Sequence, residues 1–238
     1  MEWVEDFYSR TGKWWGPVES RVSERDHRRV SLLHQHTGAA PSRVLELGAG
    51  YGATAVATAQ AGHDVTAVEI SDRADFAPDS LTMVRGDFYA VQLPGQFDVV
   101  CYWDGFGVGS DADQRRLLRR IATEWLRPGG TALIDVYNPI VWARWHGDEE
   151  HKTPDPEQGY AHELYNRTTF DPVTCVATGT WWDAARPDDK ISQLLRCYTP
   201  ADLGLLLEGT GLQLSTITAG DLLREDESYL AVLRHQVA

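Results

Sequence analysis

Short runs of aliphatic and β-branched residues alternate with helical stretches through the middle of the chain, beginning at Arg43. The runs predict strands over 43–47, 64–70, 81–85, 97–102 and 130–137, with glycine turns between them. Helices are predicted over 53–61 and 111–126, where apolar side chains recur at helical spacing. Strands that alternate with helices form parallel sheets. We therefore expect an α/β fold with helices on both faces of the sheet.

The two ends of this core carry additional segments. The first 40 residues hold an aromatic-rich stretch and a predicted helix over 17–36, in which Pro17 fits the first turn. After the fifth strand come the stretch 138–145 and a polar loop over 147–159, which we interpret as a lid. The alternating segments 160–170, 173–183 and 189–198 predict antiparallel strands, followed by a helix over 200–208 and two terminal strands.

We expect a single domain over 1–238. Its parts are a cap (1–40), a ligand-binding core (41–138), a lid with an antiparallel insert (139–199) and the end of the core (200–238).

Composition excludes several classes of protein. With 238 residues, 42% of them hydrophobic, the chain is large and apolar enough to fold around a core. The net charge of −13 repels phosphate backbones and disfavours nucleic acid as the partner. Three widely spaced cysteines suggest neither a disulfide framework nor a zinc site. The chain also has no signal-peptide pattern and no apolar run of membrane-spanning length, so we expect a soluble, cytoplasmic protein without a membrane partner.

The first predicted strand runs into a glycine-rich turn. Glycines at 48, 50 and 52 follow the strand and let a ligand approach bare backbone. Glu69 ends the second strand 19 residues after Gly50, where a carboxylate can accept both hydroxyl groups of a ribose. Together these features predict an adenosine-containing ligand.

Two nucleotides fit this turn, because Gly48, Gly50 and Ala53 also satisfy the dinucleotide fingerprint. Glu46 would repel a pyrophosphate but can hold the ammonium of a methionine moiety. Asp87, after the third strand, is placed to accept the amino group of adenine. The chain lacks a Tyr-x-x-x-Lys dyad for hydride transfer, although other dehydrogenase chemistries stay open. We favour S-adenosylmethionine (SAM) over NAD.

From residue 43 onward the chain resembles the class I SAM-dependent methyltransferases. Five motifs occur in order: 46–52, Glu69, 85–88, 97–103 and 126–130. The resemblance implies a Rossmann-like seven-stranded sheet whose last strand is antiparallel. One departure is the short segment 71–80 with Pro78, where the usual helix after the second strand is truncated.

The resemblance also implies roles for individual residues. It puts the glycines against the methionine portion, Glu69 on the ribose, Asp87 and Phe88 beside adenine, and Trp103 near the sulfonium. The predicted cofactor-binding residues are Tyr8, Glu46, Gly48, Gly50, Glu69, Ile70, Gly86, Asp87, Phe88 and Trp103. S-adenosylhomocysteine (SAH) would be the product.

An aromatic cap and an antiparallel insert make the chain similar to small-molecule N-methyltransferases of the aminosugar N,N-dimethyltransferase and glycine N-methyltransferase group. The stretch 104–108 keeps that group's glycine and aromatic residue after the fourth strand, while its flanking residues differ. This similarity predicts methylation of an amino nitrogen on a small metabolite of natural-product or antibiotic biosynthesis.

Methyl transfer from a sulfonium chiefly requires alignment and exclusion of water. Aromatic faces can shelter the cation, and a base is optional for an amine acceptor. We predict catalytic roles for Tyr8, Tyr137 and His146, and substrate contacts for Trp14, Trp15, Phe106, Trp142 and Trp145. The acidic loop that carries His146 and His151 is read as solvated, so no metal site is predicted.

Three alternatives stay open. Methylation of a hydroxyl group would require a general base, and the histidines at 146, 151 and 162 would be its candidates. A catalytically silent SAM-binding regulatory or scaffold protein would use the aromatic cap as an interaction surface. A protein or nucleic acid methyltransferase is disfavoured by the charge. The aromatic arm at the N-terminus is compatible with exchange between subunits of a homo-oligomer.

Overall fold

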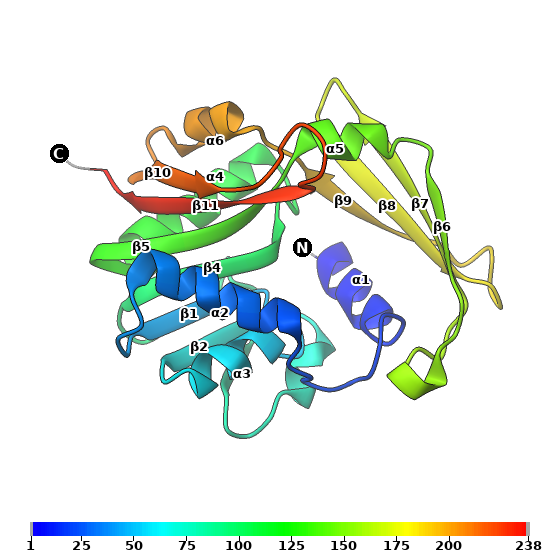
Figure 1. Cartoon of the computed structure of the whole chain (residues 1–238), viewed down its shortest axis with the longest axis horizontal. Coiled ribbons are helices and arrows are strands. Elements are labelled where there is room, and N and C mark those ends of the chain that lie inside the picture. The colour runs from blue at the N-terminus through cyan, green and yellow to red at the C-terminus, as the bar shows by residue number, and fades with distance from the viewer. Residues whose placement is uncertain (1, 237–238) are drawn as a thin grey trace.

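The computed structural model describes residues 2–236 and contains two β-sheets (Figure 1). Seven strands form the larger sheet in the order β10-β11-β5-β4-β1-β2-β3. These strands are β1 (Arg43–Leu47), β2 (Asp64–Glu69), β3 (Thr82–Arg85), β4 (Phe97–Phe106), β5 (Leu126–Tyr137), β10 (Leu212–Thr218) and β11 (Ser228–His235). The smaller sheet has the order β6-β7-β8-β9, formed by β6 (Glu149–Lys152), β7 (Leu164–Asp171), β8 (Val176–Asp183) and β9 (Ile191–Arg196).

Strands β1 to β5 pair in parallel, whereas β11 runs antiparallel to both β5 and β10. The last strand is therefore antiparallel within an otherwise largely parallel sheet. This arrangement confirms the Rossmann-like methyltransferase fold that the sequence predicts. The four-stranded sheet is antiparallel throughout and confirms the insert after the fifth strand of the core.

Helices cover both faces of the large sheet. On one face, α2 (Glu24–Thr37) and α3 (Ala53–Gln60) pack over Val44, Ala67 and Val99. On the other, α4 (Asp111–Arg120), the π-helical turn η2 (Ile121–Trp125) and α6 (Pro200–Leu207) bury the larger apolar cluster. Because side chains alternate along a strand, Leu45 and Leu47 face the second layer while Glu46 faces the α2 side.

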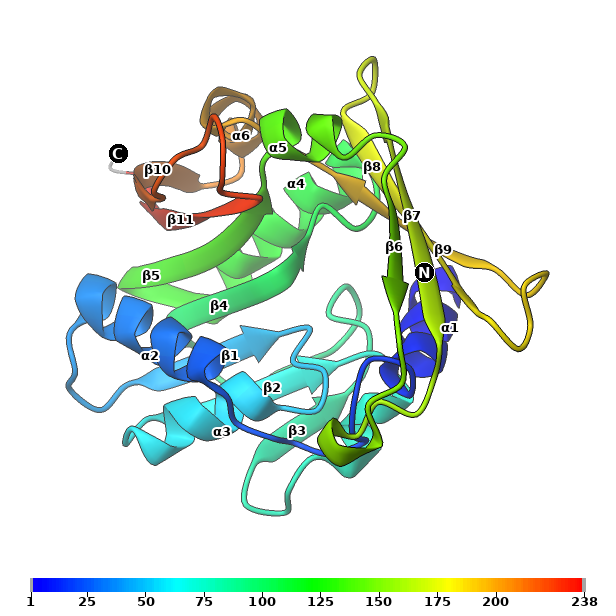
Figure 2. The ribbon, with the colours of Figure 1, turned by 45° about the vertical axis from the view of Figure 1, so that its right-hand side comes forward.

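The cap helix α1 (Glu2–Gly12) lies between the core and the insert (Figures 1 and 2). Its Val4 packs with Phe170, Ala177 and Leu195 of the small sheet. On its other side α1 contacts η1 (Asp72–Phe76), a single 3-10 turn that stands where a helix would usually follow β2. This turn confirms the truncation expected from the sequence. The helix α5 (Pro139–Arg144) and the 3-10 turn η3 (Pro156–Gln158) complete the elements.

Several predicted boundaries are wrong, each for a local reason. The helix expected from Pro17 begins only at Glu24, because Ser23 and Asp26 form a capping box there. The helix expected to reach residue 126 leaves the α-helical pattern after Arg120. The expected lid over 147–159 is partly strand, since β6 pairs with β7 at the edge of the insert. The insert strands begin two to four residues later than predicted.

Within residues 2–236, no helix is both long and apolar enough to cross a lipid bilayer.

Candidate active site

A cavity of about 880 Å³ opens at the carboxyl ends of β1, β2 and β4, beneath α1 and the loop that joins α1 to α2. Ligands of open α/β sheets bind at this edge. The insert contributes Gln193 of β9 and the residues Gln158 and Tyr160 to the wall. Of the residues predicted to form a site, eleven line this cavity: Tyr8, Trp15, Glu46, Gly48, Gly50, Glu69, Ile70, Asp87, Phe88, Trp103 and Tyr137.

The glycine turn and the end of β2 are joined directly by Glu69. Its Oε2 accepts the backbone N–H of Gly50 at 2.8 Å, and its Oε1 accepts both the N–H and the hydroxyl of Ser71 at 2.9 and 2.6 Å. Gly48, Gly50 and Gly52 all have positive φ, between 57° and 81°, which side chains rarely adopt. The backbone of this turn therefore requires glycine at these three positions. The Glu69 carboxylate is fixed at the cavity wall.

A charged cluster that the sequence analysis missed lies at the end of β1. Arg29 of α2 forms ion pairs with Asp104 and, at 3.7 Å, with Asp135, and it donates to Thr54 at 3.2 Å. Its guanidinium lies 5.3 Å from the centre of the Trp103 ring, a cation–π contact. Arg29, which lies on a helix of the cap, therefore places a positive charge at the carboxyl ends of the strands.

Two buried carboxyl groups in this cluster have raised pKa values. Burial raises the pKa of Glu46 to about 8, and the Arg29 charge opposes this shift. Burial, with repulsion from Asp104, raises the pKa of Asp135 to about 7. Both groups are therefore partly protonated near neutral pH and would ionise more readily beside a bound cation.

Asp104 itself has an unusual backbone. Its φ of 53° lies in the left-handed region, one of only two such values among the described residues other than glycine. Its carbonyl accepts the hydroxyl of Tyr137 at 2.6 Å, and Arg25 lies 3.3 Å from its carboxylate. The next residue, Gly105, leaves no room for a side chain because a Cβ would lie 2.5 Å from Tyr102. The end of β4 is thus held so that the carboxylate of Asp104 lines the cavity.

Aromatic rings surround a second arginine, Arg73, which also lines the cavity. The guanidinium of Arg73 lies 5.2, 5.4 and 5.7 Å from the ring centres of Tyr8, Trp15 and Tyr51. Its Nε donates to the carbonyl of Tyr8 at 2.9 Å. Arg73 follows Glu69 by four residues, so it connects the end of β2 to the cap. Neither Arg73 nor Tyr51 was predicted from the sequence, because no local motif marks them.

Two predicted catalytic residues, Tyr8 and Tyr137, line the cavity, but burial raises the pKa of both phenols. They stay neutral at physiological pH and can donate or accept hydrogen bonds. Neither tyrosine supplies a phenolate base.

Six predicted site residues do not line the cavity. Trp14 is buried in the cap, and Phe106 is fully buried between Tyr102 and Tyr198. His146 accepts the N–H of Phe170 at 3.0 Å and so caps the insert. The others are Gly86, whose N–H donates to the carbonyl of Glu69 at 2.8 Å, and Trp142 and Trp145, which pack on each other beside Tyr137.

The loop histidines also have structural partners. His151 lies 2.8 Å from Glu163, and His162 lies 2.7 Å from Asp183. Across residues 2–236, no group of three or more His, Cys, Asp or Glu side chains is arranged to hold a metal ion.

The fold, the glycine turn and the fixed Glu69 carboxylate define a SAM-dependent methyltransferase. Residues 21–217 match the family model of a methyltransferase domain, and the chain belongs to that family. Three solved structures with this fold hold SAM or SAH.

One curated relative is the cypemycin N-terminal methyltransferase of a Streptomyces species, 30% identical over 127 residues. The match covers 50% of this chain and 51% of that protein, so the chain spans about half the length of this relative.

Two solved structures share nearly the whole fold. The methyltransferase CcbJ of Streptomyces caelestis has a TM-score of 0.73 at 22% identity, with 96% of each chain covered. The sugar N-methyltransferase KedS8 of a Streptoalloteichus species has a TM-score of 0.65 at 19% identity, covering 97% of this chain and 92% of that one.

Proposed function

We propose that the protein transfers the methyl group of SAM to an amino nitrogen of a small metabolite in a natural-product pathway. The nitrogen lone pair forms the new N–C bond while the S–C bond breaks, and the electron pair of that bond stays on sulfur to give SAH. The excess proton on nitrogen passes to water. The enzyme must therefore align the three reacting atoms and keep other nucleophiles away.

The observation that carries this proposal is the set of groups that line the cavity. Among the described lining residues there are carboxylates and neutral tyrosines but no histidine. A hydroxyl acceptor would need a base to become nucleophilic, whereas a neutral amine needs none. KedS8, which has the same fold, is a sugar N-methyltransferase, in agreement with this choice.

The cofactor would lie along the ends of β1, β2 and β4. In this placement the Glu69 carboxylate receives the ribose hydroxyls, and Asp87 with Phe88 flanks the adenine. Glu46 lies below the glycine turn, where it would meet the ammonium of the methionine portion. The remaining volume, between Trp15, Tyr137 and Gln193, is left for the acceptor.

The test is incubation with methyl-labelled SAM and a panel of amino sugars, amino acids and short peptides, each paired with its hydroxyl analogue. Label on nitrogen, located by mass spectrometry and NMR, supports the proposal. Label confined to oxygen overturns it in favour of O-methylation. If calorimetry shows tight SAM binding and no acceptor is labelled, the silent SAM-binding protein becomes the better interpretation.

A further inference from the structure

The hydroxyl of Tyr8 is held by a residue that lies 185 positions later in the chain. Nε2 of Gln193 donates a hydrogen bond to Oη of Tyr8 at 2.5 Å. Both residues line the cavity, one from the cap helix α1 and the other from the insert strand β9. This bond therefore connects the cap and the insert at the wall of the active site.

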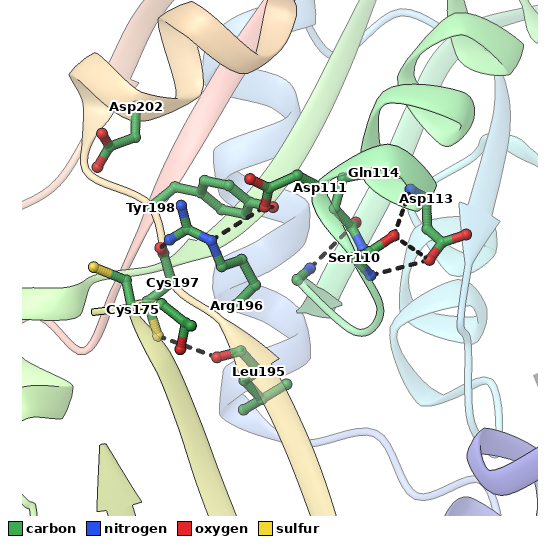
Figure 3. A network of polar contacts seen from close by, with 12 residues as sticks. Ser110, Asp111, Asp113, Gln114, Cys175, Leu195, Arg196, Cys197, Tyr198 and Asp202 are labelled. Atoms are coloured by element: carbon green, nitrogen blue, oxygen red, sulfur yellow. Dashed lines mark hydrogen bonds and ion pairs between the residues drawn. The ribbon is translucent and has the colours of Figure 1, made fainter. Parts of the chain in front are cut away.

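The strand that carries Gln193 is anchored to the core just beyond this point. Arg196 and Tyr198 both donate to Oδ1 of Asp111, at 3.1 and 2.8 Å (Figure 3). The N–H of Arg196 also donates to the carbonyl of Gly107 at 2.9 Å. A Cβ at Gly107 would lie 2.3 Å from the carbonyl oxygen of Arg196, so only glycine permits this approach. The position of β9 is consequently set by the loop that directly follows β4, the strand whose end carries Asp104.

Tyr8 is also fixed from the cofactor side. Arg73 donates to its backbone carbonyl and stacks over its ring, as described above. The ring of Phe7 meets it edge-on, with centres 5.2 Å apart. These contacts fix the position of the Tyr8 ring, so that only the hydroxyl hydrogen can still rotate.

Because Gln193 is the donor in this hydrogen bond, it determines which hydrogen-bonding groups of the Tyr8 hydroxyl remain available to a molecule in the cavity. A phenol oxygen has one hydrogen to donate and two lone pairs. Since one lone pair is taken by the Gln193 amide, the hydrogen and the second lone pair remain for a bound molecule.

We propose that Gln193 is a positioning residue for methyl transfer. It fixes the Tyr8 hydroxyl so that the free lone pair accepts an N–H of the acceptor and turns the nitrogen lone pair toward the methyl group. This inference rests on the proposed N-methyltransferase function. Gln193 acts through Tyr8, and the cap and insert together select an acceptor that presents an N–H at this position.

The first experiment measures the contact without any acceptor. In protein labelled with ¹³C at the tyrosine Cζ, the resonance that disappears in Tyr8→Phe is that of Tyr8. We expect Gln193→Ala to move this resonance, while Ser192→Ala leaves it in place. Ser192 is the matched control because it lies on the same strand, next to Gln193, and its hydroxyl bonds to that of Thr180 at 2.9 Å. An unmoved Tyr8 resonance in Gln193→Ala would overturn the proposal.

The second experiment is a double-mutant cycle on methyl transfer to an acceptor that the panel shows to be labelled. We expect Gln193→Ala to lower kcat about tenfold with an unchanged affinity for SAH, and to have an effect below twofold in the Tyr8→Phe background. Equal losses in both backgrounds would mean that Gln193 acts independently of Tyr8.

A third variant, Gln193→Glu, tests whether Tyr8 acts through a lone pair. A carboxylate can only accept, so the Tyr8 hydroxyl would donate to it and keep both lone pairs for the N–H of the acceptor, and we expect a smaller loss than in Gln193→Ala. A loss as large as in Gln193→Ala would overturn the proposal. The cycle could show coupling while the label is found on oxygen. The contact between Gln193 and Tyr8 would then be confirmed, but its proposed role toward an N–H would be wrong. The position of the label alone would overturn the proposed N-methyltransferase function.

Discussion

The Glu69 carboxylate accepts the backbone N–H of Gly50 at 2.8 Å, which ties the end of β2 to the glycine turn after β1. The same carboxylate accepts both donors of Ser71, so it is oriented before any ligand arrives. An oriented carboxylate loses little entropy when it binds a ribose. From this preorganisation we predict that Glu69 dominates recognition of the cofactor.

Replacing Glu69 by alanine should therefore weaken SAM binding by at least tenfold, through loss of charge-assisted hydrogen bonds to the ribose. Calorimetric titration with SAM measures this effect. Glu163→Ala is the control, because it removes the same charge from an exposed pair with His151 outside the cavity. An unchanged affinity in Glu69→Ala would remove Glu69 from the binding site.

Gly50→Val should abolish SAM binding in a protein that still folds. The φ of +57° at Gly50 strains any side chain by roughly 1–2 kcal/mol, and a Cβ there has only Arg73 within 4 Å, so the new side chain projects toward the cavity. Gly62→Val is a matched control, since Gly62 has a φ of +98° and open surroundings. Circular dichroism should find both variants folded, and retained binding in Gly50→Val would show that SAM lies elsewhere.

Local motifs explain how much of this site could be predicted. Glu46, Gly48, Gly50 and Glu69 line the cavity as expected, because a strand, a turn and an acidic residue at fixed spacing have one common geometry. Gln193 and Arg29 were missed because their roles depend on segments that meet only in the folded chain. For Arg29 a helical pattern did exist, since Asp26, Arg29, Val30 and Leu33 share one buried face of α2. The tryptophans at 142 and 145 lie outside the cavity lining, because aromatic side chains also fill ordinary packing positions.

His146→Gln should leave the rate of methyl transfer within twofold. His146 caps the insert through the N–H of Phe170 and does not line the cavity, so it cannot reach an acceptor proton. Glutamine can replace the hydrogen-bond acceptor, which limits the effect on folding. Steady-state kinetics with a labelled acceptor measure this, and a loss of tenfold or more would return His146 to the catalytic group and favour a hydroxyl acceptor.

Glu46→Gln should make the cofactor-free protein more stable at pH 8 than the parent protein, but not below pH 4.5. Between its unfolded pKa of about 4.5 and its folded pKa of about 8, Glu46 holds a proton only in the folded state. The unfolding free energy of the parent protein therefore falls as pH rises through this interval. The gap between the two proteins should grow over the same interval and then become constant.

Thermal unfolding at pH 4.5, 6.5 and 8.5 tests this, because about 1 kcal/mol shifts the Tm of a chain of this size by roughly 2–4 °C. A difference in Tm between the two proteins that is the same at all three pH values would contradict the buried position of Glu46. The same variant should bind SAM more weakly, since it lacks a charge for the ammonium of the methionine portion.

Arg29→Met should destabilise the protein by about 3 kcal/mol at pH 8.5, because Glu46 and Asp135 are then ionised and lose the cation that compensates them. At pH 5.5 both carboxyl groups are protonated in the folded state, so the loss should be smaller. Urea unfolding at the two pH values gives the comparison. Arg29→Lys is the control, since it keeps the charge and should recover most of the stability at pH 8.5. An equal loss at both pH values would mean that Arg29 acts through packing against Trp103 and not through its charge.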